Sequence, residues 1–255
     1  MGRLANRVAI VTGASWGIGA AVAEAFAREG AAVVVNNLPE ERMDSLADSV
    51  VGRIREAGGR AIKVPADISM PEEVERMVAT AEREFGDIDI LVANAAYSER
   101  VAWNEIDLKQ WDRTMNVNVR GTYLCARAVY PSMLRLGRGS IITLTSVTVD
   151  LGMAGFLDYV SSKAGIIGLT RALAREVGCE GIRVNSVMPG AIRTEQEVEL
   201  NFDEHELATV SAERQSIPRR GYADDLTGTF VYLASDDSAF VTGQVLTVDG
   251  GWVHH

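Results

Sequence analysis

The sequence predicts a doubly wound α/β domain, in which helices cover both faces of a parallel sheet of about seven strands. Short runs rich in β-branched residues alternate along the chain with longer amphipathic stretches. The short runs are apolar on both faces, which is typical of buried parallel strands. No repeat, low-complexity segment or linker rich in Pro, Gly or Ser divides the chain, so we expect a single domain over residues 1–255.

Seven runs are expected to form the strands, and the stretches between them the helices. Residues 18–30 show helical apolar periodicity directly after the first run. Residues 71–86 have Pro71 in their first turn and acidic residues after it, which is typical of a helix start. Ligands of parallel sheets bind beyond the carboxyl ends of the strands, so a site is expected there. The strand runs are residues 7–12, 32–36, 61–66, 89–93, 140–145, 182–187 and 244–248.

Composition argues against several classes of function. A net charge of −10 disfavours binding to nucleic acid or to an anionic membrane surface. No apolar run is long enough to span a membrane and no signal-peptide pattern opens the sequence, which predicts a cytoplasmic protein. Cys125 and Cys179 are too few and too far apart to suggest a disulfide framework. His205, His254 and His255 all lie late in the chain, so we expect neither a metal site nor a Ser-His-Asp hydrolase.

A glycine-rich turn follows the first expected strand in "VTGASWGIGAAVA". Gly13, Gly17 and Gly19 have the spacing G-x3-G-x-G, which differs from the dinucleotide fingerprint G-x-G-x-x-G. The physical purpose is shared, because glycines permit a tight turn and a close backbone approach to a diphosphate at a helix N-terminus. Glycines also serve helix–strand packing, but their place at the first strand–helix turn favours a nucleotide site.

A tyrosine and a lysine stand four residues apart in "LDYVSSK". On a helix, Tyr159 and Lys163 would lie on one face, one turn apart. Such a pair is common by chance and becomes informative only in context. A lysine cation favours the phenolate of a neighbouring tyrosine, which would bring the phenol toward the working range of a general acid–base. By themselves these residues leave two interpretations open, a catalytic pair or two unrelated side chains on one helix face.

Together these motifs resemble the short-chain dehydrogenase/reductase family. The resemblance is carried by "TGASWGIG" (12–19), "NVRG" (118–121), "SVTVDLGMAGFLDYVSSK" (146–163) and "PGAIRT" (189–194), in the family's order and at its spacings. It extends from residue 7 to about residue 251. It implies a Rossmann fold with one extra strand, an NAD(H) or NADP(H) cofactor, and hydride transfer between an alcohol and a carbonyl.

The resemblance also assigns catalytic roles to four residues. Tyr159 would move the proton of the alcohol, and Ser146 would hydrogen-bond the reacting oxygen. Lys163 would lower the tyrosine pKa and bind the nicotinamide ribose. Asn118 matches the asparagine that holds a water linked to this lysine; the neighbouring Asn116 is its competitor in register, but the pattern VN-x-x-G favours Asn118.

Further matches concern the cofactor. Ala96 stands where the family's Asn-Asn-Ala-Gly motif has glycine, so we expect its backbone to be strained. The residues expected to bind the cofactor are Gly13, Ser15, Trp16, Gly17, Ile18, Gly19, Asn37, Asp67, Ile68, Asn94, Tyr159, Lys163, Ile192 and Thr194.

The end of the second strand predicts which nicotinamide cofactor is preferred. An acid there would accept hydrogen bonds from the adenosine ribose, whereas an arginine would bind a 2′-phosphate. Asn37 takes the acid's place, Leu38 that of the following base, and Trp16 fills the other common basic position. Arg42 is the one nearby cation. We therefore expect NAD(H) to be favoured and NADP(H) to remain possible. The substitution Asn37→Asp should sharpen this preference, and Leu38→Arg should raise NADP(H) use.

The predicted reaction is hydride transfer between a nicotinamide cofactor and a small, uncharged secondary alcohol or ketone. A 3-oxoacyl-[acyl-carrier-protein] reductase is the alternative within the same family. A catalytically silent nucleotide-binding regulator is disfavoured because all four catalytic residues are present. A sugar-nucleotide epimerase or dehydratase is disfavoured because such chains are usually longer.

Two features bear on partners. Residues 195–206 contain six acids and no Lys or Arg, and Glu180 stands where carrier-protein reductases often have a base. These charges disfavour an acidic carrier protein, although an acidic run is equally typical of a solvated helix face. We expect residues 195–216 to form a substrate lid. The helices expected at 107–136 and 158–178 carry apolar residues on more than one side, among them Trp111, Tyr123, Ile166 and Leu169. One side would cover the sheet, and the resemblance pairs the other with a neighbouring subunit, which predicts a homotetramer or at least a dimer; the pattern is also compatible with all of these residues being core.

Overall fold

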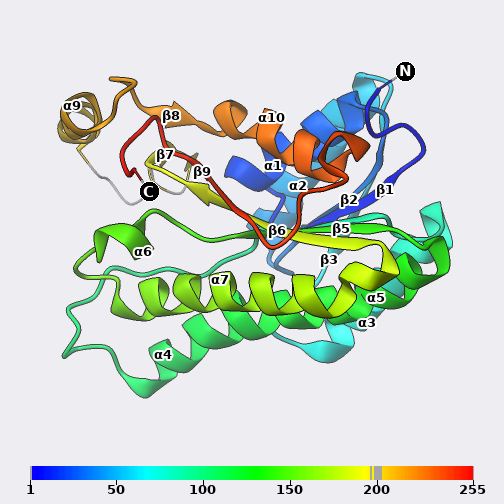
Figure 1. Ribbon diagram of the computed structural model, residues 1–255, viewed down its shortest axis with the longest axis horizontal. Helices are drawn as coiled ribbons and strands as arrows, with labels where there is room; N and C mark the ends of the chain where they lie inside the picture. Colours follow the sequence, from blue (N-terminus) through cyan, green and yellow to red (C-terminus); the bar gives the residue numbers. More distant parts are fainter. Residues whose placement is uncertain (1, 196, 198–202, 255) are drawn as a thin grey trace.

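The centre of the computed structural model is a parallel sheet of seven strands (Figure 1). The structure describes residues 2–195, 197 and 203–254. Each of the seven expected runs forms one strand, which confirms the predicted α/β sheet, although β6 continues to Pro189. In spatial order the strands are β3 (Arg60–Pro65), β2 (Ala32–Asn37), β1 (Val8–Val11), β4 (Ile90–Ala93), β5 (Gly139–Leu144), β6 (Ile182–Pro189) and β9 (Val245–Val248).

Helices cover both faces of this sheet, as Figure 1 shows. One face packs against α1 (Gly17–Arg28), α2 (Glu41–Glu56) and α10 (Ala223–Ala234). The opposite face packs against α3 (Pro71–Phe85), α5 (Thr122–Leu136) and α7 (Leu157–Val177). Shorter helices in the described part of the chain include α4 (Leu108–Met115), α6 (Thr148–Leu151) and α9 (Glu204–Arg214).

Strand β1 shows why the short runs are apolar throughout. All four of its residues are buried. Ala9 and Val11 pack toward α1 and α10, whereas Val8 and Ile10 pack toward α3 and α5. Successive side chains of a strand point to opposite faces, so a strand covered on both sides needs an apolar residue at every position.

The strand order reverses beside β1, which pairs in parallel with both β2 and β4. The chain winds outward from β1 through β2 to β3, and then returns to β4 on the other side. At such a reversal the connections leave in opposite directions, and a crevice opens beyond the carboxyl ends of the strands. The functional motifs are placed at this edge.

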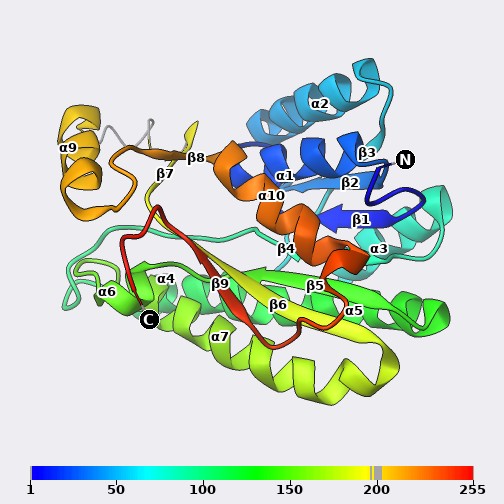
Figure 2. The same ribbon diagram turned by 45° about the horizontal axis from the view of Figure 1, so that its top comes forward.

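Two features were not expected from the sequence. The predicted helix at 107–136 contains a π-helical segment, Asn116–Gly121, between α4 and α5. A second small sheet forms from β7 (Ile192–Arg193) and β8 (Gly221–Tyr222). Helix α9 lies near these short strands, away from the seven-stranded sheet (Figure 2). Of the expected lid at 195–216, residues 196 and 198–202 lie outside the described residues.

Candidate active site

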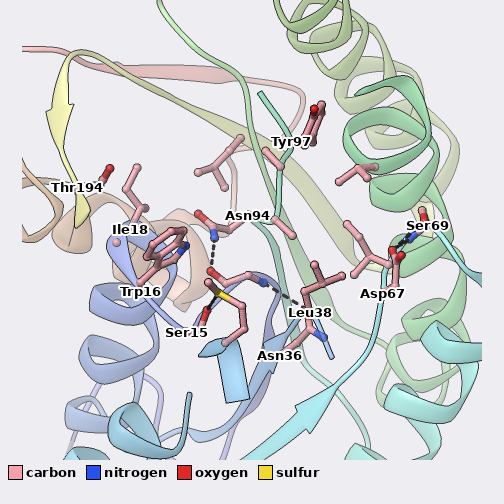
Figure 3. Close-up of a pocket in the computed structure, with 18 of the residues that line it drawn as sticks. Ser15, Trp16, Ile18, Asn36, Leu38, Asp67, Ser69, Asn94, Tyr97 and Thr194 are labelled. Carbon is pink, nitrogen blue, oxygen red and sulfur yellow. Dashed lines mark hydrogen bonds between the residues drawn. The ribbon is translucent and has the colours of Figure 1, made fainter. Parts of the chain in front are cut away.

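A cavity of about 720 Å³ lies over the carboxyl ends of the central strands (Figure 3). Most of the residues expected at the site line it: Gly13, Ser15, Trp16, Gly17, Ile18, Asp67, Ile68, Asn94, Ser146, Tyr159, Lys163, Ile192 and Thr194. Three other expected residues lie beside the cavity without lining it: Gly19, Asn37 and Asn118. The motifs from the N-terminal half and those after β5 therefore meet at one site.

The glycine turn adopts a conformation that other residues rarely reach. Gly13 and Gly17 have φ angles of +60° and +56°. A Cβ on Gly19 would lie 2.3 Å from the Gly13 carbonyl oxygen, so the turn closes tightly on itself. Asn94, after β4, holds it in place by donating to the carbonyl oxygens of Thr12 and Gly13 at 2.9 and 3.0 Å. Figure 3 shows Asn94 directed at this turn.

The N-terminus of α1 already holds an anionic group. The backbone N–H of Gly17 donates to a carboxylate oxygen of Glu195 at 2.9 Å. Free backbone N–H groups and the helix dipole favour negative charge at this position. A carboxylate oxygen therefore lies at the helix N-terminus where the sequence predicts the diphosphate of a dinucleotide.

The two asparagines at the end of β2 face different surroundings. The Asn36 amide donates to the carbonyl oxygens of Val64 and Ala66, and its Oδ1 accepts from the Gly13 N–H at 3.3 Å. Asn36 lines the cavity, but sequence reasoning missed it. Asn37 is fully buried, and the cavity is lined by Leu38 instead. The role of Asn37 as a cofactor ligand stays a prediction.

The turn after β3 forms another part of the wall. Asp67 Oδ1 accepts hydrogen bonds from the backbone N–H and the hydroxyl of Ser69, at 2.9 and 2.8 Å. Ile68 is buried and packs against Gly121. A Cβ atom on Gly121 would lie only 2.8 Å from Ile68 Cδ1, so a larger residue at position 121 would displace Ile68. Ser69 also lines the cavity and was not predicted, although it follows the expected pair directly.

Tyr159 and Lys163 lie one turn apart on α7, as expected from their spacing. Lys163 Nζ lies 5.5 Å from the centre of the Tyr159 ring and donates to the Leu144 carbonyl oxygen at 2.9 Å. The Thr145 hydroxyl donates to the Lys163 carbonyl oxygen at 2.9 Å. The end of β5 therefore fixes both the backbone and the side chain of this lysine, which is only 4% exposed.

The surroundings shift the pKa of both groups. Burial raises the pKa of the Tyr159 phenol, while a hydrogen bond with Ser146 acts in the opposite direction. Burial also lowers the pKa of the Lys163 ammonium from 10.5 to about 8. Burial thus shifts each pKa toward the neutral form, contrary to the expected lowering of the tyrosine pKa, although a lysine with a pKa of about 8 is still mostly protonated at pH 7. The physical reason is desolvation, which is the largest cause of both shifts.

Asn118 lies in the π-helical segment and hydrogen-bonds to a loop on one side and a helix on the other. Its Oδ1 accepts from the Tyr97 N–H at 2.7 Å, and its Nδ2 donates to the Tyr97 carbonyl oxygen and to Ser162 Oγ, both at 2.9 Å. The Thr122 hydroxyl donates to the Asn118 carbonyl oxygen at 2.7 Å. Asn118 therefore joins the loop after β4 to α7. A role in holding a water beside Lys163 stays a prediction.

The expected strain at Ala96 is absent. Among the described residues, Asn6 is the only one other than glycine with a positive φ. The loop after β4 therefore follows a path that alanine adopts freely, and the family glycine is not needed here. That prediction was wrong.

Two further cavity residues escaped the sequence reasoning. Tyr97 and Arg113 both line the cavity, and the Arg113 guanidinium carbon lies 4.2 Å from the centre of the Tyr97 ring. The Tyr97 hydroxyl donates to Glu99 at 2.5 Å, a hydrogen bond that raises the phenol pKa. No motif in the sequence singles out either residue.

Other kinds of site find no support in the part of the chain that the structure describes. That part contains no cluster of three or more His, Cys, Asp or Glu side chains able to hold a metal ion. Nor does it contain a helix that is both long and apolar enough to cross a membrane.

Comparison with known proteins places the chain among oxidoreductases. A family model described as enoyl-(acyl carrier protein) reductase matches residues 13–253. The chain is 42% identical to the (2S)-[(R)-hydroxy(phenyl)methyl]succinyl-CoA dehydrogenase subunit BbsD of Thauera aromatica, over 96% of both chains. It is 38% identical to the 3-oxoacyl-[acyl-carrier-protein] reductase of Synechocystis, over 99% of both chains.

Solved structures agree with these relatives. A short-chain type dehydrogenase/reductase from Mycobacterium marinum superposes with a TM-score of 0.90 at 34% identity, covering 99% of this chain and 97% of the other. A candidate NAD(P) dependent gluconate 5-dehydrogenase from Beutenbergia cavernae, solved with NADP bound at low occupancy, gives the same TM-score and identity, covering 98% and 97%.

Proposed function

The chain belongs to the short-chain dehydrogenase/reductase family, and from this premise we propose that it interconverts a small secondary alcohol and its ketone, with NAD(H) as the preferred cofactor. Proteins of this family are NAD(P)-dependent oxidoreductases. One observation carries the proposal: Ser146, Tyr159 and Lys163 border the same cavity as the glycine turn, so a dinucleotide bound at the turn would reach the phenol.

Different parts of the cavity would hold different parts of the cofactor. The glycine turn and the N-terminus of α1 suit the diphosphate, because they offer backbone N–H groups to an anion. Asp67 and Ile68 would contact the adenine, Lys163 the nicotinamide ribose, and Ile192 and Thr194 the carboxamide. When bound, the cofactor supplies the hydride acceptor for oxidation or the hydride donor for reduction.

Tyr159 would carry the proton. During reduction its hydroxyl gives a proton to the carbonyl oxygen, and during oxidation the phenolate takes the proton of the alcohol. Burial favours the protonated phenol, which suits the reductive direction directly. Oxidation needs positive charge near the phenol, which the Lys163 ammonium and an oxidised nicotinamide provide. Ser146 would hydrogen-bond the reacting oxygen. General acid–base catalysis of the kind proposed for Tyr159 contributes about 10²–10⁴-fold to the rate.

The cavity wall supports a preference for NAD(H). Beyond β2 this wall consists of Leu38, Pro39, Glu40 and Met43, with no Lys or Arg among them. A 2′-phosphate there would lack the charge-assisted hydrogen bonds that make its recognition selective. Arg42 is the nearest cation in sequence, and its guanidinium carbon lies 5.3 Å from the centre of the Trp16 ring.

The alternative substrate is a 3-oxoacyl group on acyl-carrier protein, which the similarity to the Synechocystis reductase favours. A silent regulator is disfavoured, because Asn118, Ser146, Tyr159 and Lys163 are all retained. We further propose a cytoplasmic homotetramer, with residues 195–216 covering the substrate.

The direct test is a panel of secondary alcohols and ketones, each assayed with NAD(H) and NADP(H) by the absorbance of the reduced nicotinamide. The proposal predicts turnover of at least one substrate pair, faster with NAD(H). Binding of the cofactor without turnover of any alcohol, ketone or acyl thioester would favour the silent regulator instead.

A further inference from the structure

The side-chain amide of Asn37 is held in one orientation at the end of β2. Its Nδ2 donates to Asp44 Oδ1 at 2.8 Å and to the Leu38 carbonyl oxygen at 2.9 Å, which uses both of its N–H groups. Its Oδ1 is buried and has no hydrogen-bond partner among the described residues. Reversing the amide would place this oxygen against two acceptors, so the observed orientation is strongly preferred.

We propose that Asp44 is a positioning residue that turns Asn37 into a pure acceptor, and that this pair selects the ribose 2′-hydroxyl of NAD(H) against the 2′-phosphate of NADP(H). The inference rests on the proposed cofactor site. A hydroxyl can donate to Asn37 Oδ1, whereas a phosphate dianion offers only acceptors. An asparagine with a free amide would donate to the phosphate, but Asp44 occupies the N–H group that would do so.

The backbone of Asn37 borders the cavity, although its side chain does not line it. Asn36 and Leu38, on either side of it, both line the cavity. So do Ser15 and Met43, whose Oγ and Sδ atoms lie 3.5 Å apart. Because Oδ1 itself is not exposed, the ribose must displace part of this wall. Met43 has a flexible side chain that permits such a movement, and a buried acceptor without a partner gains from a new donor.

The charge of Asp44 acts in the same direction as its hydrogen bond. Lys63 Nζ lies 3.9 Å from the Asp44 carboxylate but only 2.7 Å from that of Asp48. The lysine therefore pairs mainly with Asp48, and the Asp44 charge is only partly neutralised. A remaining negative charge beside Asn37 repels a phosphate more than a hydroxyl.

The test measures binding alone, by calorimetry with ADP-ribose and with 2′-phospho-ADP-ribose. We expect the wild-type protein to bind ADP-ribose more tightly. The ratio to compare is Kd for 2′-phospho-ADP-ribose divided by Kd for ADP-ribose. Asp44→Ala should reduce this ratio about tenfold, mainly because the phosphorylated ligand binds more tightly, since charge-assisted hydrogen bonds are the strong ones. Asp44→Asn, which keeps the shape but lets the pair reverse, should act in the same direction. Asp48→Ala keeps the hydrogen bond between Asp44 and Asn37 but leaves Lys63 with Asp44 as its nearest carboxylate. It should therefore lower the ratio only through the charge, and by less than Asp44→Ala.

A swapped pair separates positioning from a merely structural role. In Asn37→Asp/Asp44→Asn, the carboxylate moves to β2 and the amide to α2, so position 37 remains an acceptor. We expect this double variant to recover the wild-type ratio. Asn37→Asp alone places a second carboxylate beside Asp44 and should weaken the binding of both ligands. This revises the sequence-based expectation that the substitution sharpens the preference for NAD(H).

The outcomes are distinguishable. An unchanged ratio in folded Asp44→Ala and Asp44→Asn, or a swapped pair that fails to recover the ratio, would overturn the inference. Wild-type protein that binds both ligands equally would also overturn the inference, but it would still support a cofactor site in this cavity. Wild-type protein that binds neither ligand would instead contradict the proposed function.

Discussion

Lys163 Nζ lies 5.5 Å from the centre of the Tyr159 ring and donates to the carbonyl oxygen of Leu144, at the end of β5. The ammonium is thus buried beside a phenol and a backbone carbonyl. Because a buried charge is costly, this relationship has consequences for stability as well as for catalysis.

We expect the stability of the wild-type protein, relative to Lys163→Met, to rise with pH. Burial lowers the pKa of Lys163 from 10.5 to about 8. Below about pH 8, Lys163 is protonated in both the folded and the unfolded chain, and the folded protein bears the full cost of the buried charge. Between about 8 and 10.5 only the unfolded chain keeps it, so the free energy of unfolding increases with pH.

One pKa unit corresponds to about 1.4 kcal/mol, so the total gain should be on the order of 3 kcal/mol. Denaturant unfolding of both proteins at several pH values across this window measures it. A difference in unfolding free energy that stays constant with pH would contradict the assigned titration of Lys163.

Glu195→Gln should tighten the binding of ADP-ribose. The Glu195 carboxylate accepts from the Gly17 N–H, where the cofactor diphosphate is expected, so the two anions compete. A charge at a helix end contributes about 0.3–1 kcal/mol, which corresponds to about two- to fivefold in affinity. Calorimetry at low salt measures this, with Glu204→Gln as the control, because Glu204 pairs with Arg193 instead. Equal or weaker binding by Glu195→Gln would show that the carboxylate does not occupy the diphosphate position.

The proposed tetramer should depend on the outer face of α5. Tyr123 is 51% exposed there, and Leu134 on the same helix is 42% exposed. Ile166 on α7 is buried, so it belongs to the apolar side that packs within the subunit. Light scattering should give the mass of four chains for the wild type and a smaller mass for Tyr123→Asp. A wild-type monomer at micromolar concentration would refute the assembly.

Attachment of the substrate to a carrier protein should not raise its kcat/KM. We expect a 3-oxoacyl group on acyl-carrier protein to react with lower kcat/KM than the same group on pantetheine, because like charges slow encounter. Part of the acidic run is neutralised, since Glu197 pairs with Arg220 and Glu204 with Arg193, so the penalty should be modest. It should shrink as salt is added. A clear advantage for the carrier-bound group would identify the protein as a carrier-protein reductase.

The sequence predicted the strands and much of the cavity for a physical reason. Both depend on local requirements, namely apolar runs for buried strands and glycines for the tight turn after β1. The π-helical segment at Asn116–Gly121 was missed because the apolar pattern runs through it like an ordinary helix. The cavity residues Tyr97 and Arg113 were missed because their placement depends on how a loop packs against a distant helix.

The end of β2 shows the same limit in a single pair of residues. Alternation along a strand implies that Asn36 and Asn37 point to opposite faces. It does not tell which of them lines the cavity, nor that α2 supplies Asp44 as a partner for the other. That contact joins residues of separate elements, and only the packed structure reveals it.

The central claim is that Tyr159 transfers the proton during hydride exchange with a secondary alcohol or ketone. The most direct measurement compares the wild type with Tyr159→Phe, in turnover of the best substrate and in binding of NAD(H). The account predicts that Tyr159→Phe loses about 10²–10⁴-fold in kcat while it still folds and binds the cofactor. Lys163→Ala should lose activity and also bind the cofactor more weakly. Near-wild-type turnover by folded Tyr159→Phe on every accepted substrate would contradict the proposed mechanism.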